Sequence, residues 1–323
     1  MPKIFVTRPI PEFGIDMLKA KGWEVVVNEA ANDRPASHEE VIAGVRGCDA
    51  LLSVLTEKID AEVMDAGLPT LKIVANYAVG FDNIDLKAAA EKNIIVTNTP
   101  GALTNTVAEH AFALLLSVAH RVSESERFTR AGMYKAWGPK MFLGEDLSGK
   151  TIGIVGLGRI GSRVAYHAVK GFDMKVLYTD VKPNADFEKE LGATFVAELK
   201  DLLPQCDFVS IHVPLLDSTR HLFNADTFKL MKPTAYLVNT SRGPIIDEKA
   251  LAEALKNNVI KGAGIDVFEF EPQITPELMS LGNIVMTPHI ASATHQTRSG
   301  MSEIAAKNII EVLEGRSALN PVK

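Results

Sequence analysis

Cysteine is scarce in this sequence, and neither sign of charge dominates it. The two cysteines, Cys48 and Cys206, stand far apart and at no metal-ligand spacing, which argues against a disulfide framework and a cysteine zinc site. His289 and His295 also lack a plausible third ligand nearby, so no metal is expected. The formal net charge of −6, from 34 Lys and Arg against 40 Asp and Glu, gives no overall attraction to nucleic acid.

Long hydrophobic runs are missing as well. The most apolar stretch, 111–119, is much shorter than the roughly 20 residues that cross a bilayer, and it is typical of a buried helix. The first ten residues lack the apolar core of a signal peptide. We therefore expect no membrane partner, and the few cysteines fit a reducing, cytoplasmic location.

What the sequence does contain is a regular alternation of short apolar runs with amphipathic stretches. Strands are predicted in a first series near 4–6, 25–27, 51–52, 73–75 and 94–96. A second series is predicted near 151–155, 175–179, 207–211, 235–239, 261–265 and 284–287. This βαβα pattern predicts an α/β fold with two doubly wound domains, each a parallel sheet covered by helices on both faces.

The segments around these series have their own patterns. Helices are expected near 14–20, 38–45 and 60–66, and a last one over roughly 294–314. Pro100-Gly101 separates the two series, and Thr104 or Thr106 is expected to cap the long helix that follows. The segment 130–150 carries four glycines without clear periodicity, and we interpret it as a long functional loop.

A glycine motif follows the first strand of the second series directly. Gly156 allows a tight turn, Gly158 lets backbone amides approach a pyrophosphate, and Gly161 permits close packing of the next helix on the strand. The following strand ends at Asp180, nineteen residues after Gly161, where a carboxylate can accept hydrogen bonds from ribose hydroxyls. Strand, motif, helix and acid in this order predict a Rossmann domain that binds NAD, with NADP possible.

Three polar residues follow later strands of the second series. Arg242 and His289 come directly after strand ends, and Glu271 lies a few residues beyond one, so all three can face one crevice. Reduction of a 2-keto acid needs a carboxylate anchor and a proton donor. Arg242 can bind the carboxylate and polarise the carbonyl, His289 can act as general acid, and Glu271 can orient the imidazole. Singly, each has a plainer explanation: a surface arginine, a structural histidine or a solvated carboxylate.

Taken together, the motifs resemble those of a known family. In chain order they are GLGRIG (156–161), SRGPIID (241–247), GIDVFEFEP (264–272) and TPHIASAT (287–294), and they are similar to motifs of the D-isomer-specific 2-hydroxyacid dehydrogenases. The resemblance implies that Arg242, Glu271 and His289 are catalytic. It also implies a flavodoxin-like substrate-binding domain, 1–99 plus 290–323, and a Rossmann NAD(P)-binding domain, 100–289.

The same resemblance implies further site residues. The segment 75–85 is similar to the family's substrate-carboxylate loop, in which the amides of Val79 and Gly80 would bind the anion. Other substrate-binding residues implied are Leu55, Trp137, Arg242 and Ser292. Cofactor-binding residues implied are Gly156, Leu157, Gly158, Arg159, Ile160, Gly161, Asp180, Thr104, Pro214, Thr219, Thr240 and Asp266.

Within the family, the segment 137–144 is most similar to glyoxylate/hydroxypyruvate reductases. There a Trp from the partner subunit walls the pocket, so the resemblance implies a homodimer with Trp137 in that role or as a simple interface anchor. The expected function is reduction of small 2-keto acids, glyoxylate and hydroxypyruvate, with NAD(P)H. One alternative is another dehydrogenase of the family, for D-lactate or for D-3-phosphoglycerate. The phosphoglycerate enzyme is disfavoured because the chain ends at Lys323. The other alternative is an NAD-sensing, corepressor-like binding protein.

Overall fold

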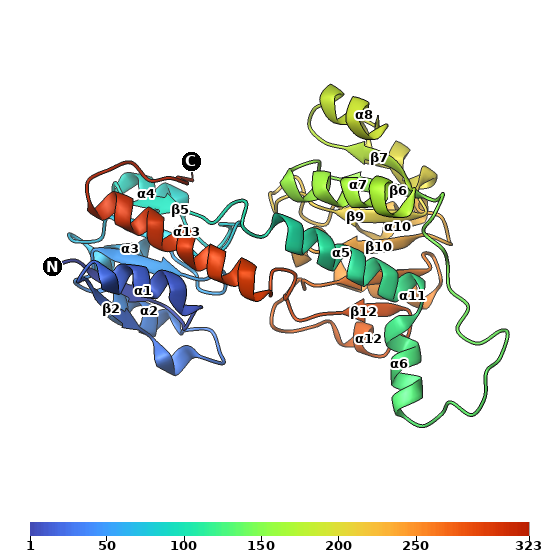
Figure 1. Ribbon diagram of the computed structural model, residues 1–323, viewed down its shortest axis with the longest axis horizontal. Helices are drawn as coiled ribbons and strands as arrows, with labels where there is room; N and C mark the ends of the chain where they lie inside the picture. The colour runs from blue at the N-terminus through green and yellow to red at the C-terminus, as the bar shows by residue number, and fades with distance from the viewer. Residues whose placement is uncertain (323) are drawn as a thin grey trace. The chain divides into compact units, whose positions relative to one another are not determined.

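Two parallel β-sheets organise the protein, one in each of two units (Figure 1). The structure is a computed structural model and describes residues 1–322. The first unit comprises Met1–Leu103 and the segment from Ala293 onward, and the second comprises Thr104–Ser292. The chain thus passes between units after Leu103 and after Ser292. The bounds expected from the sequence were 1–99 plus 290–323 for one domain and 100–289 for the other.

The first unit contains a five-stranded sheet in the order β2-β1-β3-β4-β5. Its strands are β1 Lys3–Val6, β2 Glu24–Val27, β3 Ala50–Ser53, β4 Ile73–Asn76 and β5 Ile95–Thr97, all parallel. This is the flavodoxin-like strand order, as predicted. The central strands β3 and β4 are buried along their whole length, because helices cover both faces.

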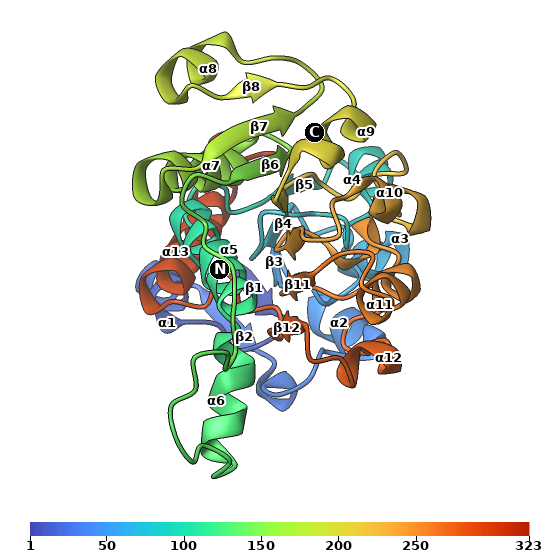
Figure 2. The same ribbon diagram turned by 90° about the vertical axis from the view of Figure 1, so that its right-hand side faces the viewer.

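The helices of this unit divide between the two faces of the sheet. They are α1 Glu12–Ala20, α2 His38–Val45, α3 Ala61–Gly67, α4 Leu86–Glu91 and α13 His295–Leu313. Helices α1 and α13 lie together on one face, and α2, α3 and α4 lie on the other (Figure 2). Gly14 permits the close approach of α1 to α13, since a Cβ there would clash with Ser302. The last helix thereby completes a unit that begins at the other end of the chain.

The second unit contains a seven-stranded sheet in the order β12-β11-β10-β9-β6-β7-β8. Its strands are β6 Thr151–Val155, β7 Lys175–Thr179, β8 Thr194–Phe195, β9 Phe208–Ile211, β10 Tyr236–Asn239, β11 Gly262–Ile265 and β12 Ile284–Met286. All are parallel, and the order reverses between β6 and β9 as in the Rossmann fold. The carboxyl ends of these strands therefore share one edge.

Helices pack on both faces of this sheet too. They are α5 Thr104–Ala119, α7 Arg159–Phe172, α8 Ala185–Leu191, α9 Leu199–Leu202, α10 Ala225–Leu230, α11 Glu248–Lys256 and α12 Pro276–Met279. Helix α5 packs on α7, β10 and β11. Helix α5 begins at Thr104, so the two threonines expected near its cap are its first and third residues.

One segment of the second unit stands apart from the sheet. Helix α6, Val122–Arg130, has no buried residue, and the segment 131–150 that follows contains no helix or strand, as predicted (Figure 1). We call residues 122–143 the arm. Within 1–322, no helix is both long and apolar enough to cross a membrane. The same residues contain no group of three or more His, Cys, Asp or Glu side chains placed to hold a metal ion.

Candidate active site

The glycine motif forms the turn between β6 and α7, and its three glycines have three different surroundings. Gly156 has a φ of +95°, and a Cβ there would lie 2.8 Å from the carbonyl carbon of His212. A Cβ on Gly161 would clash with the carbonyl oxygen of Gly156. A Cβ on Gly158, in contrast, would meet nothing within 4 Å. The turn is therefore closely packed at Gly156 and Gly161. At Gly158 it is open, so that a phosphate could approach the backbone there.

Asp180 lies at the end of β7, beside this turn. Its Oδ2 accepts a hydrogen bond from the Leu157 amide at 2.6 Å, and its Oδ1 accepts one from the Val181 amide at 2.6 Å. Helix α7 begins at Arg159 without a side-chain cap. Its first-turn amides and its dipole are thus available to an anion, and the Asp180 carboxylate lies beside them.

Of the other predicted cofactor residues, Pro214 and Thr219 lie close together. Thr219 Oγ1 donates to the Pro214 carbonyl at 2.6 Å and accepts from the Leu216 amide at 2.8 Å, so these residues form one turn after β9. The Oγ1 atom of Thr240, after β10, is buried and has no hydrogen-bond partner in residues 1–322. A buried hydroxyl without a partner fits a ligand-binding position. Thr104 starts α5, and no hydrogen bond joins it to the described residues of this group.

The structure brings Glu271 and His289 together. Glu271 Oε2 lies 2.9 Å from His289 Nδ1, and Glu271 Oε1 accepts the Phe268 amide at 2.9 Å. The Phe268 amide thus fixes the carboxylate of Glu271, and the carboxylate in turn fixes the imidazole of His289. The opposite ring nitrogen of His289, Nε2, has no partner within the described chain, so it is available to a substrate.

Arg242 lies in the loop after β10, which packs against the loop that carries Glu271. A Cβ on Gly243 would clash with the carbonyl group of Phe268, so only glycine lets the two loops approach this closely. The fully buried Asn239 shapes the Arg242 loop: its Nδ2 donates to the Arg242 carbonyl at 3.0 Å. Its Oδ1 accepts from the amide and hydroxyl of Ser241. Asn239 was not among the predicted site residues.

Asp266 is fully buried at the end of β11. Its carboxylate accepts hydrogen bonds from Thr287 Oγ1 at 2.6 Å and from the amides of Ile290 at 2.8 Å and Ala291 at 2.7 Å. Burial raises the pKa of Asp266, but hydrogen bonds from His110, Thr287 and the two amides outweigh it and lower the pKa below its usual range. His110 and Thr287 were not predicted as site residues, since neither stands out by sequence spacing.

In the first unit, the loop after β4 presents two main-chain amides. Asn98 Nδ2 donates to the Val79 carbonyl at 2.7 Å, and Asn76 Nδ2 donates to the Gly80 carbonyl at 2.9 Å. Neither the Val79 nor the Gly80 amide has a partner among residues 1–322. Loop carbonyls held by asparagines, with amides left open, form a suitable site for an anion.

The remaining predicted substrate residues are less constrained. Leu55 and Ser292 are partly exposed, and Trp137 is 79% exposed in the arm. The buried Glu57 holds the chain next to Leu55 by accepting the Val54 amide at 3.2 Å and the Thr7 hydroxyl at 2.9 Å.

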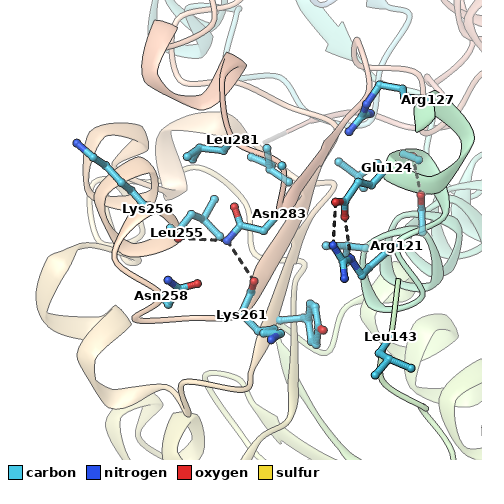
Figure 3. A pocket seen from close by; sticks show the side chains of 17 residues that line it. Arg121, Glu124, Arg127, Leu143, Leu255, Lys256, Asn258, Lys261, Leu281 and Asn283 are labelled. Carbon is cyan, nitrogen blue, oxygen red and sulfur yellow. Dashed lines mark hydrogen bonds and ion pairs between the residues drawn. The ribbon is translucent and has the colours of Figure 1, made fainter. Parts of the chain in front are cut away.

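A pocket of about 450 Å³ lies elsewhere in the second unit, between α5, α6 and the end of α11 (Figure 3). Its lining includes Tyr236, Lys261 and Asn283, which stand at or before the amino ends of β10, β11 and β12. The predicted catalytic residues follow the carboxyl ends of the same strands. None of the predicted site residues lines this pocket, so it is not the candidate active site.

Comparison with known proteins gives a family match. The family model described as D-isomer specific 2-hydroxyacid dehydrogenase, NAD binding domain, matches residues 112–291. A glyoxylate reductase of Korarchaeum cryptofilum is 51% identical over 324 residues, which cover 99% of this chain and 96% of the relative.

Solved structures agree with this match over nearly the whole chain. A protein of Thermus thermophilus superposes with a TM-score of 0.93 at 42% identity, covering 99% of this chain and 100% of that one. An NADPH-dependent glyoxylate/hydroxypyruvate reductase of Sinorhizobium meliloti, in complex with NADP and malonate, has a TM-score of 0.85 at 34% identity. It covers 99% of this chain and 96% of its own.

Proposed function

Because the chain belongs to the D-isomer specific 2-hydroxyacid dehydrogenase family, we propose that it reduces glyoxylate and hydroxypyruvate to their 2-hydroxy acids with NAD(P)H. It is an NAD(P)-dependent oxidoreductase, and relatives named glyoxylate reductase support the choice of a small 2-keto acid. The observation that carries the proposal is the 2.9 Å contact between Glu271 and His289 Nδ1, which leaves Nε2 open.

The proposed chemistry adds a hydride and a proton across the keto group. The reduced nicotinamide supplies the hydride when it is bound. His289 Nε2 donates the proton to the oxygen of the former carbonyl, while Glu271 holds Nδ1 and thereby orients the ring. Arg242 binds the substrate carboxylate and polarises the carbonyl, because a guanidinium is always charged and matches a carboxylate in shape.

The residues around the glycine motif fit a dinucleotide. The open side of Gly158 and the uncapped start of α7 suit the pyrophosphate, and Asp180 suits the adenosine ribose. The buried Thr240 hydroxyl offers a further hydrogen-bonding group. With these we propose the predicted set Gly156, Leu157, Gly158, Arg159, Ile160, Gly161, Asp180, Thr104, Pro214, Thr219, Thr240 and Asp266.

For the substrate, we propose that the open amides of Val79 and Gly80 bind its carboxylate. Leu55 and Trp137 are proposed to limit the size of the acid, and Ser292 is proposed to contact it. These roles rest on the family resemblance, and the first unit is accordingly proposed as the substrate-binding domain.

The arm supports the proposal of a homodimer. Its exposed fractions include 79% for Trp137, 64% for Leu143, 55% for Met133 and 53% for Tyr134. Apolar side chains gathered on one exposed segment are typical of an interaction site, and a second copy of the chain is the proposed occupant.

A reducing cytoplasm is the proposed location, supported by two cysteines that are both buried as free thiols.

The test of the function is NADH oxidation with a panel of 2-keto acids. We expect efficient reduction of glyoxylate and hydroxypyruvate, weaker reduction of pyruvate and poor reduction of phenylpyruvate. If NADH binds but no keto acid of the panel supports its oxidation, the proposal is ruled out. Equal efficiency with phenylpyruvate rejects the small-acid assignment alone.

A further inference from the structure

His110 and Thr287, two residues without a part in the proposed chemistry, meet the buried Asp266 next to the catalytic histidine. Thr287 Oγ1 lies 2.6 Å from Asp266 Oδ1. His110 Nε2 lies 3.0 Å from Thr287 Oγ1 and 3.5 Å from Asp266 Oδ1. The three come from α5, from the end of β11 and from the segment after β12, so they join separate parts of the second unit.

The direction of these hydrogen bonds follows from counting protons. The ionised carboxylate of Asp266 can only accept, so the single hydroxyl proton of Thr287 is donated to it. Thr287 Oγ1 must then accept from His110, which fixes the proton of His110 on Nε2. The result is a directed chain from the imidazole through the hydroxyl to the carboxylate.

Asp266 in turn binds the backbone of His289 and of the two residues that follow it. Its main-chain oxygen accepts the His289 amide at 2.8 Å. Its carboxylate accepts the amides of Ile290 and Ala291, so three consecutive amides converge on one residue. This matters because His289 has a φ of +54°, in the left-handed region that a residue with a side chain rarely adopts.

We propose that His110, Thr287 and Asp266 form a positioning network, which holds the left-handed backbone of His289 and thereby directs its imidazole toward the substrate. His110 and Thr287 are positioning residues, because their hydrogen bonds reach the chemistry only through Asp266 and the backbone. The inference rests on the proposed function, since it takes His289 as the proton donor.

The test compares Thr287→Val, which keeps the shape and loses the hydroxyl, with Thr287→Ser, which keeps the hydroxyl. We expect kcat for glyoxylate reduction to fall about ten- to a hundredfold in Thr287→Val, because a small misplacement of a reacting group is costly. Thr287→Ser should stay within about threefold of wild type. The Kd for NADH, measured by fluorescence, should change by less than about twofold in both.

A second pair makes the test independent of how well one variant folds. His110→Gln keeps an N–H donor, while His110→Leu loses it, so only His110→Leu should lower kcat, by about fivefold. Thermal unfolding of each variant checks that the fold is intact.

The possible results separate this inference from the proposed function. A wild-type kcat in both Thr287→Val and His110→Leu overturns the network. Equal losses of kcat in Thr287→Val and Thr287→Ser, or in His110→Leu and His110→Gln, also overturn it, because they would indicate an effect of packing alone. A weakened Kd for NADH that accounts for the lost rate also overturns it, since the network would then serve the cofactor. A wild-type protein that reduces no keto acid refutes the proposed function instead.

Discussion

Two segments of the second unit, the proposed catalytic segment 287–291 and the arm 122–143, differ in how many contacts they make within the chain. Around His289, the amides of residues 289–291 all have partners on Asp266, and the imidazole is held by Glu271. In the arm, α6 has no buried residue and Trp137 is 79% exposed. The first segment is held by contacts within one chain, whereas the apolar side chains of the second are exposed, which fits the proposed dimer interface.

This difference agrees with the different tasks that we propose for the two segments. A catalytic group needs a fixed position, and hydrogen bonds from buried groups provide it. An interface needs apolar side chains that remain exposed until the partner covers them. Mutations in the first segment should therefore change kcat, and mutations in the second should change assembly.

The largest effect is expected for His289→Ala. Loss of a positioned general acid typically lowers the rate by about 10²–10⁴-fold. The kcat of glyoxylate reduction should fall by that factor while the Kd for NADH stays near the wild-type value. A fall of less than about threefold would remove His289 from the mechanism and leave the catalytic segment without its proposed task.

A smaller effect is expected for Trp137→Ala in the arm. Truncation of a central aromatic anchor costs about 2 kcal/mol or more, which is roughly a 30-fold weaker dimer. Sedimentation equilibrium measures the dissociation constant directly. Phe13→Ala is a matched control, because Phe13 is also more than half exposed but lies outside the arm. Equal dissociation constants for wild type and Trp137→Ala would mean that the arm is not the interface.

The cofactor preference should respond to Asp180. Its carboxylate would repel the 2′-phosphate of NADP while it accepts the ribose hydroxyls of NAD, so wild type should prefer NADH. Replacing the carboxylate by the neutral Asp180→Ser should shift the ratio of kcat/KM values about tenfold toward NADPH, with Lys182 nearby to help bind the phosphate. A wild-type preference for NADPH, or an unchanged ratio in the variant, contradicts this role.

The sequence predicted the architecture well because the buried parallel strands are short apolar runs with turns between them. All strands of the two predicted series are present, and the strand–glycine–helix–acid order identified the Rossmann unit. Short elements were not predicted, among them α10 Ala225–Leu230 and the two-residue strand β8, because one or two turns carry too little periodicity.

The sequence can propose a site residue where its type is chemically informative at a strand end, as for Arg242 and His289. Asn239 was not proposed, although its hydrogen bonds reach only Ser241 and Arg242, two and three positions away. His110 and Thr287 were not proposed because their contact joins distant segments. His110 and Thr287 are 177 positions apart, and nothing in either local sequence indicates the other. The left-handed backbone of His289 was likewise invisible, since a histidine has no sequence preference that announces it.

The pair of Glu271 and His289 is the centre of this account, and the variant Glu271→Gln tests it most directly. The carboxylate of Glu271 lies 2.9 Å from His289 Nδ1, so it holds the imidazole in one orientation. Glutamine keeps the shape but replaces one carboxylate oxygen by an amide nitrogen. With saturating NADH, kcat for glyoxylate reduction should fall about ten- to a hundredfold in Glu271→Gln, because a small misplacement of a reacting group is costly. The Kd for NADH should be the same as in wild type. A wild-type kcat in the variant would contradict the proposal that Glu271 positions His289.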